Sequence, residues 1–159
     1  MRIAAKATEQ LILESSLRIR EPIFLERCSI SNGEIHVHVN FRRGAHFHCQ
    51  NCGSELTEVH DTVVKIWRHM DFMGRKCYVH MRTPRIDCYS CGISRWTPPW
   101  ASGRSHFTEL FESEVVALSK VMPVNPLGRF VDEHDTRLWR IIRRHAERRG
   151  VKHQRELSQ

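Results

Sequence analysis

Two cysteine pairs carry the residues best suited to metal chemistry. Cys49 and Cys52 are separated by two residues, Cys88 and Cys91 repeat this spacing, and a glycine follows each pair. Such a loop, called a knuckle here, presents two thiolates from one tight turn, and the glycine permits the backbone to close behind them. Two facing knuckles supply four sulfur ligands, the tetrahedral set that Zn²⁺ prefers. The repeated spacing predicts one zinc ion bound by all four cysteines.

The predicted zinc is structural, because four thiolates leave no position on the ion for water or substrate. Residues 53–87 separate the knuckles, a length that suits strands running out and back between them. Zinc binding could add on the order of 10 kcal/mol to a core too small to be stable alone. Iron in a rubredoxin-like site is the chemical alternative. Colour separates the two, because ferric tetrathiolate is red and zinc is colourless.

The remaining cysteines and nearby histidines are weaker ligand candidates. His46, His48 and His60 lie near the first knuckle, and we expect them to be surface or strand histidines. Cys28 and Cys77 lie in strand-like surroundings, where we expect buried, small apolar side chains. In a reducing compartment, six cysteines favour metal ligation over disulfides.

The composition points to an anionic partner. The chain has 159 residues, a formal net charge of +7 and a pI near 9.4. Nucleic acid is the commonest partner of such a basic chain, although a basic protein without one has the same balance. No apolar run is long enough to span a membrane, and the N-terminus lacks the apolar centre of a signal peptide. We therefore expect an intracellular protein.

The sequence predicts a helical arm over residues 1–20, followed by a β-rich part. Apolar and polar residues alternate over Ile35–Phe41, as in a half-buried strand, and a turn at Ser31–Gly33 joins it to an antiparallel partner at Ile23–Leu25. Further strands are expected at Thr62–Arg68 and Lys76–Ile86, with a turn at Met73–Arg75. Basic residues on these strands either hold a DNA backbone or are exposed charges without a partner: Lys65, Arg68, Arg75, Lys76, Arg82 and Arg85.

The periodicity becomes helical after the two prolines at 98 and 99 and a linker at 101–104. A first helix is expected to be capped by Thr108, a second by Asn125 with Pro126 at its first position, and a third by Asp135. The third helix carries the apolar stripe Leu138, Ile141, Ile142 and His145. Three helices with a short connection at 132–134 match the helix-turn-helix plan, although its usual turn glycine is replaced by an acidic residue.

The third helix is strongly basic. Because its apolar stripe must face inward, its arginines must face outward. Early residues of such a helix reach base edges, which predicts base contacts for Thr136, Arg137 and Arg140. Later arginines suit phosphates, which predicts phosphate contacts for Arg143, Arg144 and Arg148. A solvated basic face on a bundle helix is the alternative, and Trp139 is expected in the core.

The order of these motifs resembles the N-terminal region of insertion-sequence transposases of the ISL-three type. The similarity covers roughly residues 17–149 and includes these stretches in order between and after the knuckles: Trp67–Phe72, Pro84–Cys88, Pro99–Ala101 and Phe107–Glu112. It implies a zinc ribbon on Cys49, Cys52, Cys88 and Cys91, then a helix-turn-helix that recognises terminal inverted repeats. The family often has Cys-Pro-x-Cys knuckles, where this chain has Gln50 and Tyr89.

The family's catalytic part has no counterpart in this sequence. Strand transfer needs three carboxylates that hold two divalent ions, and no acidic residue has a suitable constellation, including Asp71, Asp87, Asp132 and Asp135. We expect no enzymatic activity and no small-molecule substrate. The implied partner is double-stranded DNA, in the cytoplasm and on the nucleoid of a prokaryote, and self-association as a dimer is left open.

These observations combine into one expected architecture. The fold class is α+β, with a small antiparallel β zinc-ribbon domain followed by a three-helix helix-turn-helix domain. The expected divisions are a helical arm at 1–20, the zinc-ribbon domain at 21–104, the helix-turn-helix domain at 105–150 and a polar tail at 151–159. The expected function is sequence-specific DNA binding for a transposase. A stand-alone transcriptional regulator, a protein-binding adaptor and a nuclease are the alternatives.

Overall fold

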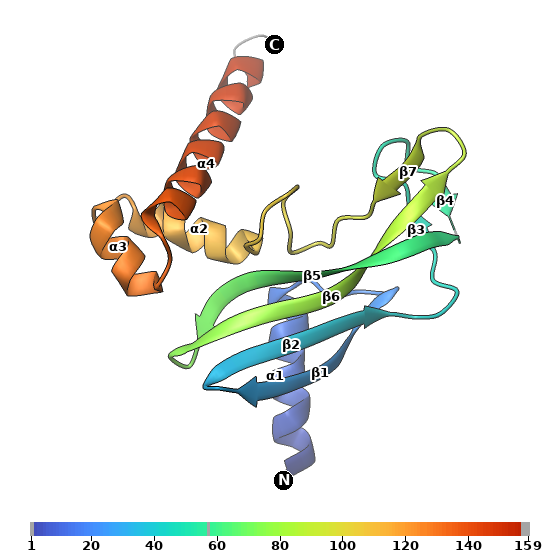
Figure 1. The fold of residues 1–159 in the computed structure, drawn as a ribbon, viewed down its shortest axis with the longest axis horizontal. Coiled ribbons are helices and arrows are strands. Elements are labelled where there is room, and N and C mark those ends of the chain that lie inside the picture. Colours follow the sequence, from blue (N-terminus) through green and yellow to red (C-terminus); the bar gives the residue numbers. More distant parts are fainter. Residues whose placement is uncertain (1, 57, 157–159) are drawn as a thin grey trace. The chain divides into compact units, whose positions relative to one another are not determined.

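The computed structural model describes residues 2–56 and 58–156, and the chain forms two compact units that divide after Thr108 (Figure 1). The first unit, residues 1–108, holds one helix and all the strands of the described residues. The second unit, residues 109–159, is helical. The fold class is therefore α+β, as the sequence predicts. No described helix has the length and apolar character needed to cross a membrane.

The first unit is a sheet with a helix on it and a small ribbon at one end. Its elements are α1 (Arg2–Ser16), β1 (Ile23–Ser31), β2 (Glu34–Phe41), β3 (Phe47–His48), β4 (Glu55–Leu56), β5 (Val59–Phe72), β6 (Arg75–Cys88) and β7 (Gly92–Arg95).

The main sheet has the strand order β1-β2-β6-β5, and β7 pairs with the end of β6 (Figure 1). Both predicted hairpins are confirmed. β1 and β2 join through Asn32-Gly33, and β5 and β6 join through Met73-Gly74, with positive φ at both central residues of each turn.

The expectation of an antiparallel sheet is only partly right. β2 pairs with β6 in parallel, with Val37 opposite Val79, so the sheet is mixed. The chain leaves β2, forms the first knuckle and returns through β5 before β6 inserts between β5 and β2. Such a pairing depends on distant segments meeting, and local alternation of apolar residues does not reveal it.

The C-terminal end of helix α1 and the residue that follows it contribute to the core of the first unit. Leu13 and Leu17 pack with Val37 and Val79 from the sheet, and Leu17 has no exposed surface. An edge-to-face contact between Trp67 and the later Trp100, with ring centroids 5.7 Å apart, extends this core. The later part of the arm that the sequence predicts at 1–20 therefore packs on the sheet.

The second unit consists of α2 (Glu109–Leu118), α3 (Val124–Val131) and α4 (Asp135–Glu156). Its core is built from the predicted apolar stripes: Phe111, Val115, Leu127, Leu138 and Ile141 are all buried. The predicted cap of the second helix is wrong, because the N-cap of α3 is Pro123 and Asn125 lies inside the first turn. Pro123 has extended backbone angles that suit an N-cap, and Pro126 loses no helical hydrogen bond in the first turn.

The turn between α3 and α4 is tight because Gly128 has no side chain. Asp132 has a φ of 51°, and the Glu133 N–H donates to the Gly128 carbonyl at 2.9 Å. A Cβ at position 128 would lie 2.5 Å from Asp135 Oδ1 and 2.8 Å from the Glu133 carbonyl. The glycine of this helix-turn-helix therefore lies within α3, four residues before the corner where the sequence analysis looked for it.

We predict that Gly128→Ala lowers the free energy of unfolding by about 1–3 kcal/mol. Alanine favours helix by about 1 kcal/mol over glycine, but here its methyl group would collide with backbone. Gly150→Ala is the matched control, because Gly150 is also helical and has open space around it. Chemical denaturation followed by circular dichroism compares the two. Equal or greater stability of Gly128→Ala would show that the turn is not closely packed.

Candidate metal centre and nucleic-acid interface

The two knuckles lie at the ends of two short hairpins. The first lies between β3 and β4, and the second lies between β6 and β7. Gly53 and Gly92 have φ of +79° and +71°, the conformation that closes each turn behind its cysteines. In the first knuckle, the Gly53 N–H donates to the Cys49 carbonyl at 2.7 Å. Both glycines therefore have the role that the sequence predicts for them.

The four predicted ligands form one cluster. The sulfur atoms of Cys49, Cys52, Cys88 and Cys91 all lie within 4.8 Å of one another, and Cys52 Sγ is 3.5 Å from Cys88 Sγ. Zinc–sulfur bonds of about 2.3 Å in a tetrahedron place sulfurs about 3.8 Å apart, which is close to this spacing. Cys49 and Cys88 are buried, whereas Cys52 and Cys91 are exposed. The donor set fits one structural Zn²⁺ held between the hairpins.

Hydrogen bonds distribute protons unevenly over the cluster. Ser54 Oγ lies 3.3 Å from Cys52 Sγ, and hydrogen bonding by Ser54 lowers the pKa of Cys52 to about 6. The hydrogen bond with Cys52 raises the pKa of Cys91 to about 12. Cysteines bind zinc as thiolates, so metal binding displaces the protons that the cluster carries.

The core beneath the cluster is small. It contains Ala45, Phe47 and Ile86 together with the two buried cysteines. Phe47 contacts Phe41 and Trp96 edge-on, with ring centroids 5.3 and 5.1 Å away. So few apolar groups stabilise this end of the molecule weakly, and metal coordination is therefore expected to supply much of its folding energy.

Gln50 is a structural residue that the sequence analysis did not identify. Its side-chain amide donates to the Thr97 carbonyl at 2.9 Å and accepts from the Thr97 N–H at 3.1 Å. This pair ties the first knuckle to the segment that follows β7, so Gln50 restrains a loop that often carries proline in the family it resembles. A glutamine inside a knuckle is the only sequence signal, and its partner lies 47 residues away.

The other cysteines and histidines lie outside the cluster. Cys77 is buried as expected, but the expectation for Cys28 is wrong, because its side chain is exposed on β1. β1 forms one edge of the sheet, which leaves Cys28 at the border of the helix-covered face. His46 pairs with Glu55 at 3.1 Å, and His48 and His60 are exposed.

We predict that Cys88→Ser removes the bound metal and lowers the melting temperature of the first unit. Cys28→Ser is the matched control, because it makes the same change at an exposed cysteine outside the cluster. Elemental analysis of purified protein should give one zinc per chain for the native chain and for Cys28→Ser, and much less for Cys88→Ser. Full zinc content in Cys88→Ser would contradict the assigned ligand set.

The outer face of α4 presents the predicted basic surface. Leu138 and Ile141 are fully buried against the other helices of the second unit, while Thr136, Arg140, Arg143 and Arg148 are exposed. The prediction that Trp139 lies in the core is wrong. This side chain is 46% exposed, and the Arg143 guanidinium lies 6.0 Å from its ring centroid. The core of a three-helix unit needs only a narrow stripe of α4, and Trp139 lies beside that stripe.

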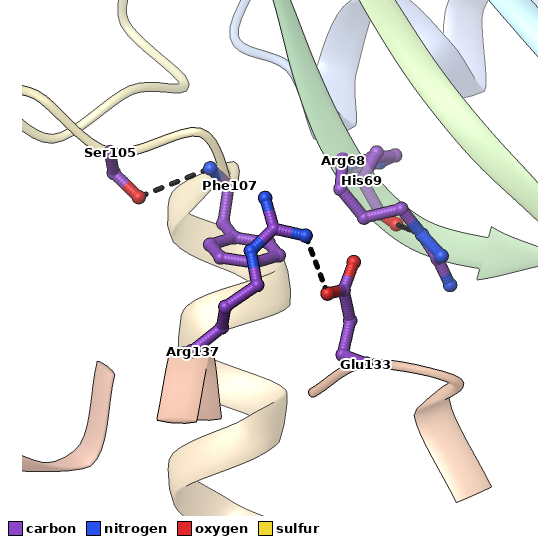
Figure 2. Close-up of polar contacts among 6 residues, drawn as sticks. All are labelled: Arg68, His69, Ser105, Phe107, Glu133 and Arg137. Carbon is purple, nitrogen blue, oxygen red and sulfur yellow. Dashed lines mark hydrogen bonds and ion pairs between the residues drawn. The ribbon is translucent and has the colours of Figure 1, made fainter. Parts of the chain in front are cut away.

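Two of the six predicted DNA-contacting residues make ion pairs within the second unit. Arg137 pairs with Glu133 at 2.7 Å across the start of α4, as Figure 2 shows. The figure also shows a separate turn of the first unit, where Ser105 accepts from the Phe107 N–H at 3.1 Å. Arg144 lies 3.0 Å from Glu112, which is completely buried and is also 3.2 Å from His145.

Glu112 therefore connects α2 to α4. From the sequence, Glu112 reads as a first-turn acidic residue that complements the helix dipole, and nothing there signals burial. A buried carboxylate is stable only when it is paired and hydrogen-bonded, and Arg144 and His145 supply both interactions. This use of Arg144 favours a structural role over the phosphate contact predicted for it.

We predict that Arg144→Ala destabilises the second unit by about 3–5 kcal/mol, because it leaves a buried charge without its strongest partner. Arg143→Ala is the control, since Arg143 is an exposed neighbour on the same helix. Denaturant unfolding measures both. If the two variants are equally stable, the Arg144–Glu112 pair does not stabilise the unit. The phosphate contact predicted for Arg144 would then remain open.

Comparison with known families agrees with this geometry. Residues 45–91 match the family model described as the zinc-finger of transposase IS204/IS1001/IS1096/IS1165, and residues 97–146 match the helix-turn-helix domain of transposase family ISL3. The first match covers both knuckles up to Cys91, and the second covers all of α2 and α3 and the first half of α4. Searches of curated proteins and of solved structures gave no match.

Proposed function

We propose that this chain, which carries the zinc-ribbon and helix-turn-helix domains of ISL3-family transposases, recognises the terminal inverted repeats of an insertion element through α4. The chain would bind the ends of the element. Strand transfer itself needs a site of carboxylates that hold two divalent ions. Within residues 2–56 and 58–156, the one His, Cys, Asp or Glu group suited to a metal is the four-cysteine cluster. DNA binding of this kind places the protein on the nucleoid.

The observation that carries the proposal is the uncompensated positive face of α4. Arg140 and Arg143 are exposed on the side of α4 opposite the apolar stripe, Arg148 and Arg149 are exposed beyond the last residue of that stripe, and none of the four makes an ion pair with a residue that the structure describes. The second helix of a helix-turn-helix motif can enter the major groove when one side is buried and the exposed side carries arginines. Guanidinium groups also bind phosphate without a proton exchange, because they are always charged.

The described contacts refine the roles along the helix. Arg140 is the leading candidate for base readout, because a free guanidinium can bind guanine O6 and N7 together. Thr136 lies one turn earlier and is also exposed. Arg137 can contribute only by exchanging Glu133 for a base or phosphate. Arg143 and Arg148 suit phosphates, which position the helix without reading sequence.

A stand-alone transcriptional regulator with the same fold is the second candidate function. The exposed face of α4 serves either role equally well, so only the bound sequence separates them. Recovery of element ends from genomic DNA supports a transposase role, whereas recovery of promoters supports the regulator. Dimer formation would favour paired half-sites in either case.

We predict that Arg140→Ala reduces discrimination between a selected duplex and its scrambled version by about 5- to 150-fold, equivalent to about 1–3 kcal/mol for one bidentate contact. Arg148→Ala should instead weaken binding to both duplexes about equally. Fluorescence anisotropy with labelled duplexes measures this, and Arg43→Ala, an exposed arginine of the first unit, is the control for lost charge. Equal effects of Arg140→Ala and Arg148→Ala on both duplexes would refute the division of roles.

The native affinity should also depend steeply on salt. With about six phosphate contacts, affinity falls about a thousandfold between 50 and 200 mM salt. Titration over this range gives the slope directly. A slope near zero, or no binding to any duplex at low salt, would contradict DNA binding by this chain.

A further inference from the structure

A basic pocket opens on the first unit, away from the zinc ligands. It is open to solvent, has a volume of about 360 Å³ and is lined by residues of β5, β6, the last residue of β7 and the loop that follows. Its lining combines apolar strand residues with four basic side chains and one hydroxyl: Val63, Val64, Lys65, Thr83, Arg95, Arg104 and His106. No carboxylate lines it.

The hydroxyl in this pocket lacks an internal partner. Thr83 is 1% exposed, and among the described residues its Oγ1 has no hydrogen-bond partner. Thr83 lies opposite Val63 on the neighbouring strand, so its side chain is on the same face of the sheet as Val63 and Lys65. A buried hydroxyl without a partner costs free energy, which a bound water or a ligand that accepts its hydrogen bond would recover.

The cations around the hydroxyl have no anionic partner among the described residues, although Lys65 Nζ lies 4.9 Å from the ring centroid of Trp67. Lys65, Arg95 and Arg104 make no ion pair with any residue that the structure describes. Asp61, on the same strand as Lys65, is ion-paired with Arg85 and does not line the pocket. Burial, and secondarily the charge of Arg95, lower the pKa of Lys65. Neighbouring cations lower one another's pKa, and an anion that binds between them stabilises their charged forms.

The loop that completes the pocket is fixed to the sheet. The Arg68 N–H donates to the His106 carbonyl at 2.8 Å, and the Thr108 N–H donates to the Arg68 carbonyl at 3.0 Å. Ser105 forms a turn with Ser102 through a 3.2 Å backbone hydrogen bond. The loop carrying Arg104 and His106 is therefore held beside β5, so little ordering is needed before a ligand binds.

We propose that this pocket binds a phosphate group, and that its ligand in the cell is a backbone phosphate of the same DNA that α4 recognises. A phosphate has several acceptor oxygens, which can receive the Thr83 hydroxyl and the Lys65 and Arg95 donors together. The zinc-ribbon unit would thereby add a sequence-independent contact of its own. The inference rests on the proposed function for its DNA partner, whereas phosphate binding itself does not.

The remaining basic residues of the β-rich part are less suitable for DNA. Arg68 is 4% exposed and pairs with Asp71, Arg85 pairs with Asp61, and Arg75 donates to the Gly33 carbonyl at 3.2 Å. From the sequence, either DNA contact or unpartnered exposure is expected for the whole group. The structure instead pairs these three within the unit and leaves Lys65 facing the pocket.

Thr83→Val provides the sharpest test, because it removes the hydroxyl and nearly keeps the shape. The full zinc-loaded chain is titrated with inorganic phosphate, and binding is followed by NMR shifts of the pocket amides. We expect millimolar binding by the native chain, about tenfold weaker binding by Thr83→Val, and equal or higher thermal stability of that variant. Phosphate binding that is absent, or unchanged in Thr83→Val, would overturn the proposal.

A second pair of variants tests the DNA partner. Arg95→Gln should weaken phosphate binding, weaken binding to selected and scrambled duplexes about equally, and reduce the salt slope by about one. Arg43→Gln, with the same charge change outside the pocket, should leave phosphate binding unchanged.

The outcomes separate the two proposals. If the native chain binds DNA and Arg95→Gln binds it with the same affinity, the pocket does not contact the DNA backbone. That result leaves the proposed role of α4 unaffected. If Arg95→Gln weakens phosphate binding but the native chain binds no duplex, the pocket is a site for free phosphate. That result refutes both the DNA partner and the proposed function.

Discussion

Zinc coordination by four thiolates is the interaction on which the ribbon depends. The end of the first unit that carries the knuckles has few apolar residues beneath it, and its two hairpins are short. Sulfur atoms brought within 4.8 Å of one another would repel as thiolates unless a cation lay among them. A zinc ion bound by these four cysteines would both link the hairpins and neutralise the charge of its own ligands. The Gln50 contact with Thr97 adds a second link between the same regions of the chain.

The second unit uses its charges in two different ways. Glu112 is buried and contacts Arg144 and His145, so these contacts hold α2 against α4. The arginines on the other side of α4 have no such partners in the described chain, and their charge is directed at solvent. The same residue type thus stabilises the unit at one position and is available to a polyanion at others. The contact with Glu112 separates Arg144 from the exposed arginines of α4.

Local sequence patterns predicted much of this structure. Spacing identified the metal ligands, because a CxxCG loop is a short-range feature. Alternation and turn residues likewise located the two long hairpins. The parallel pairing of β2 with β6, the burial of Glu112 and the pocket around Thr83 were not predictable, because each depends on segments far apart in the chain. Trp139 and Cys28 were misplaced for a related reason: their residue types suit a core, but their positions lie at its border.

Selection of bound duplexes from a random pool, using the full zinc-loaded chain, tests the central claim most directly. The claim is that α4 reads duplex sequence from a chain whose ribbon is held together by zinc. The account predicts enrichment of one short motif, and loss of preference at one base position of that motif when Arg140 is replaced by alanine. A pool that stays random after repeated rounds, with metal content and folding verified on the same sample, would contradict it.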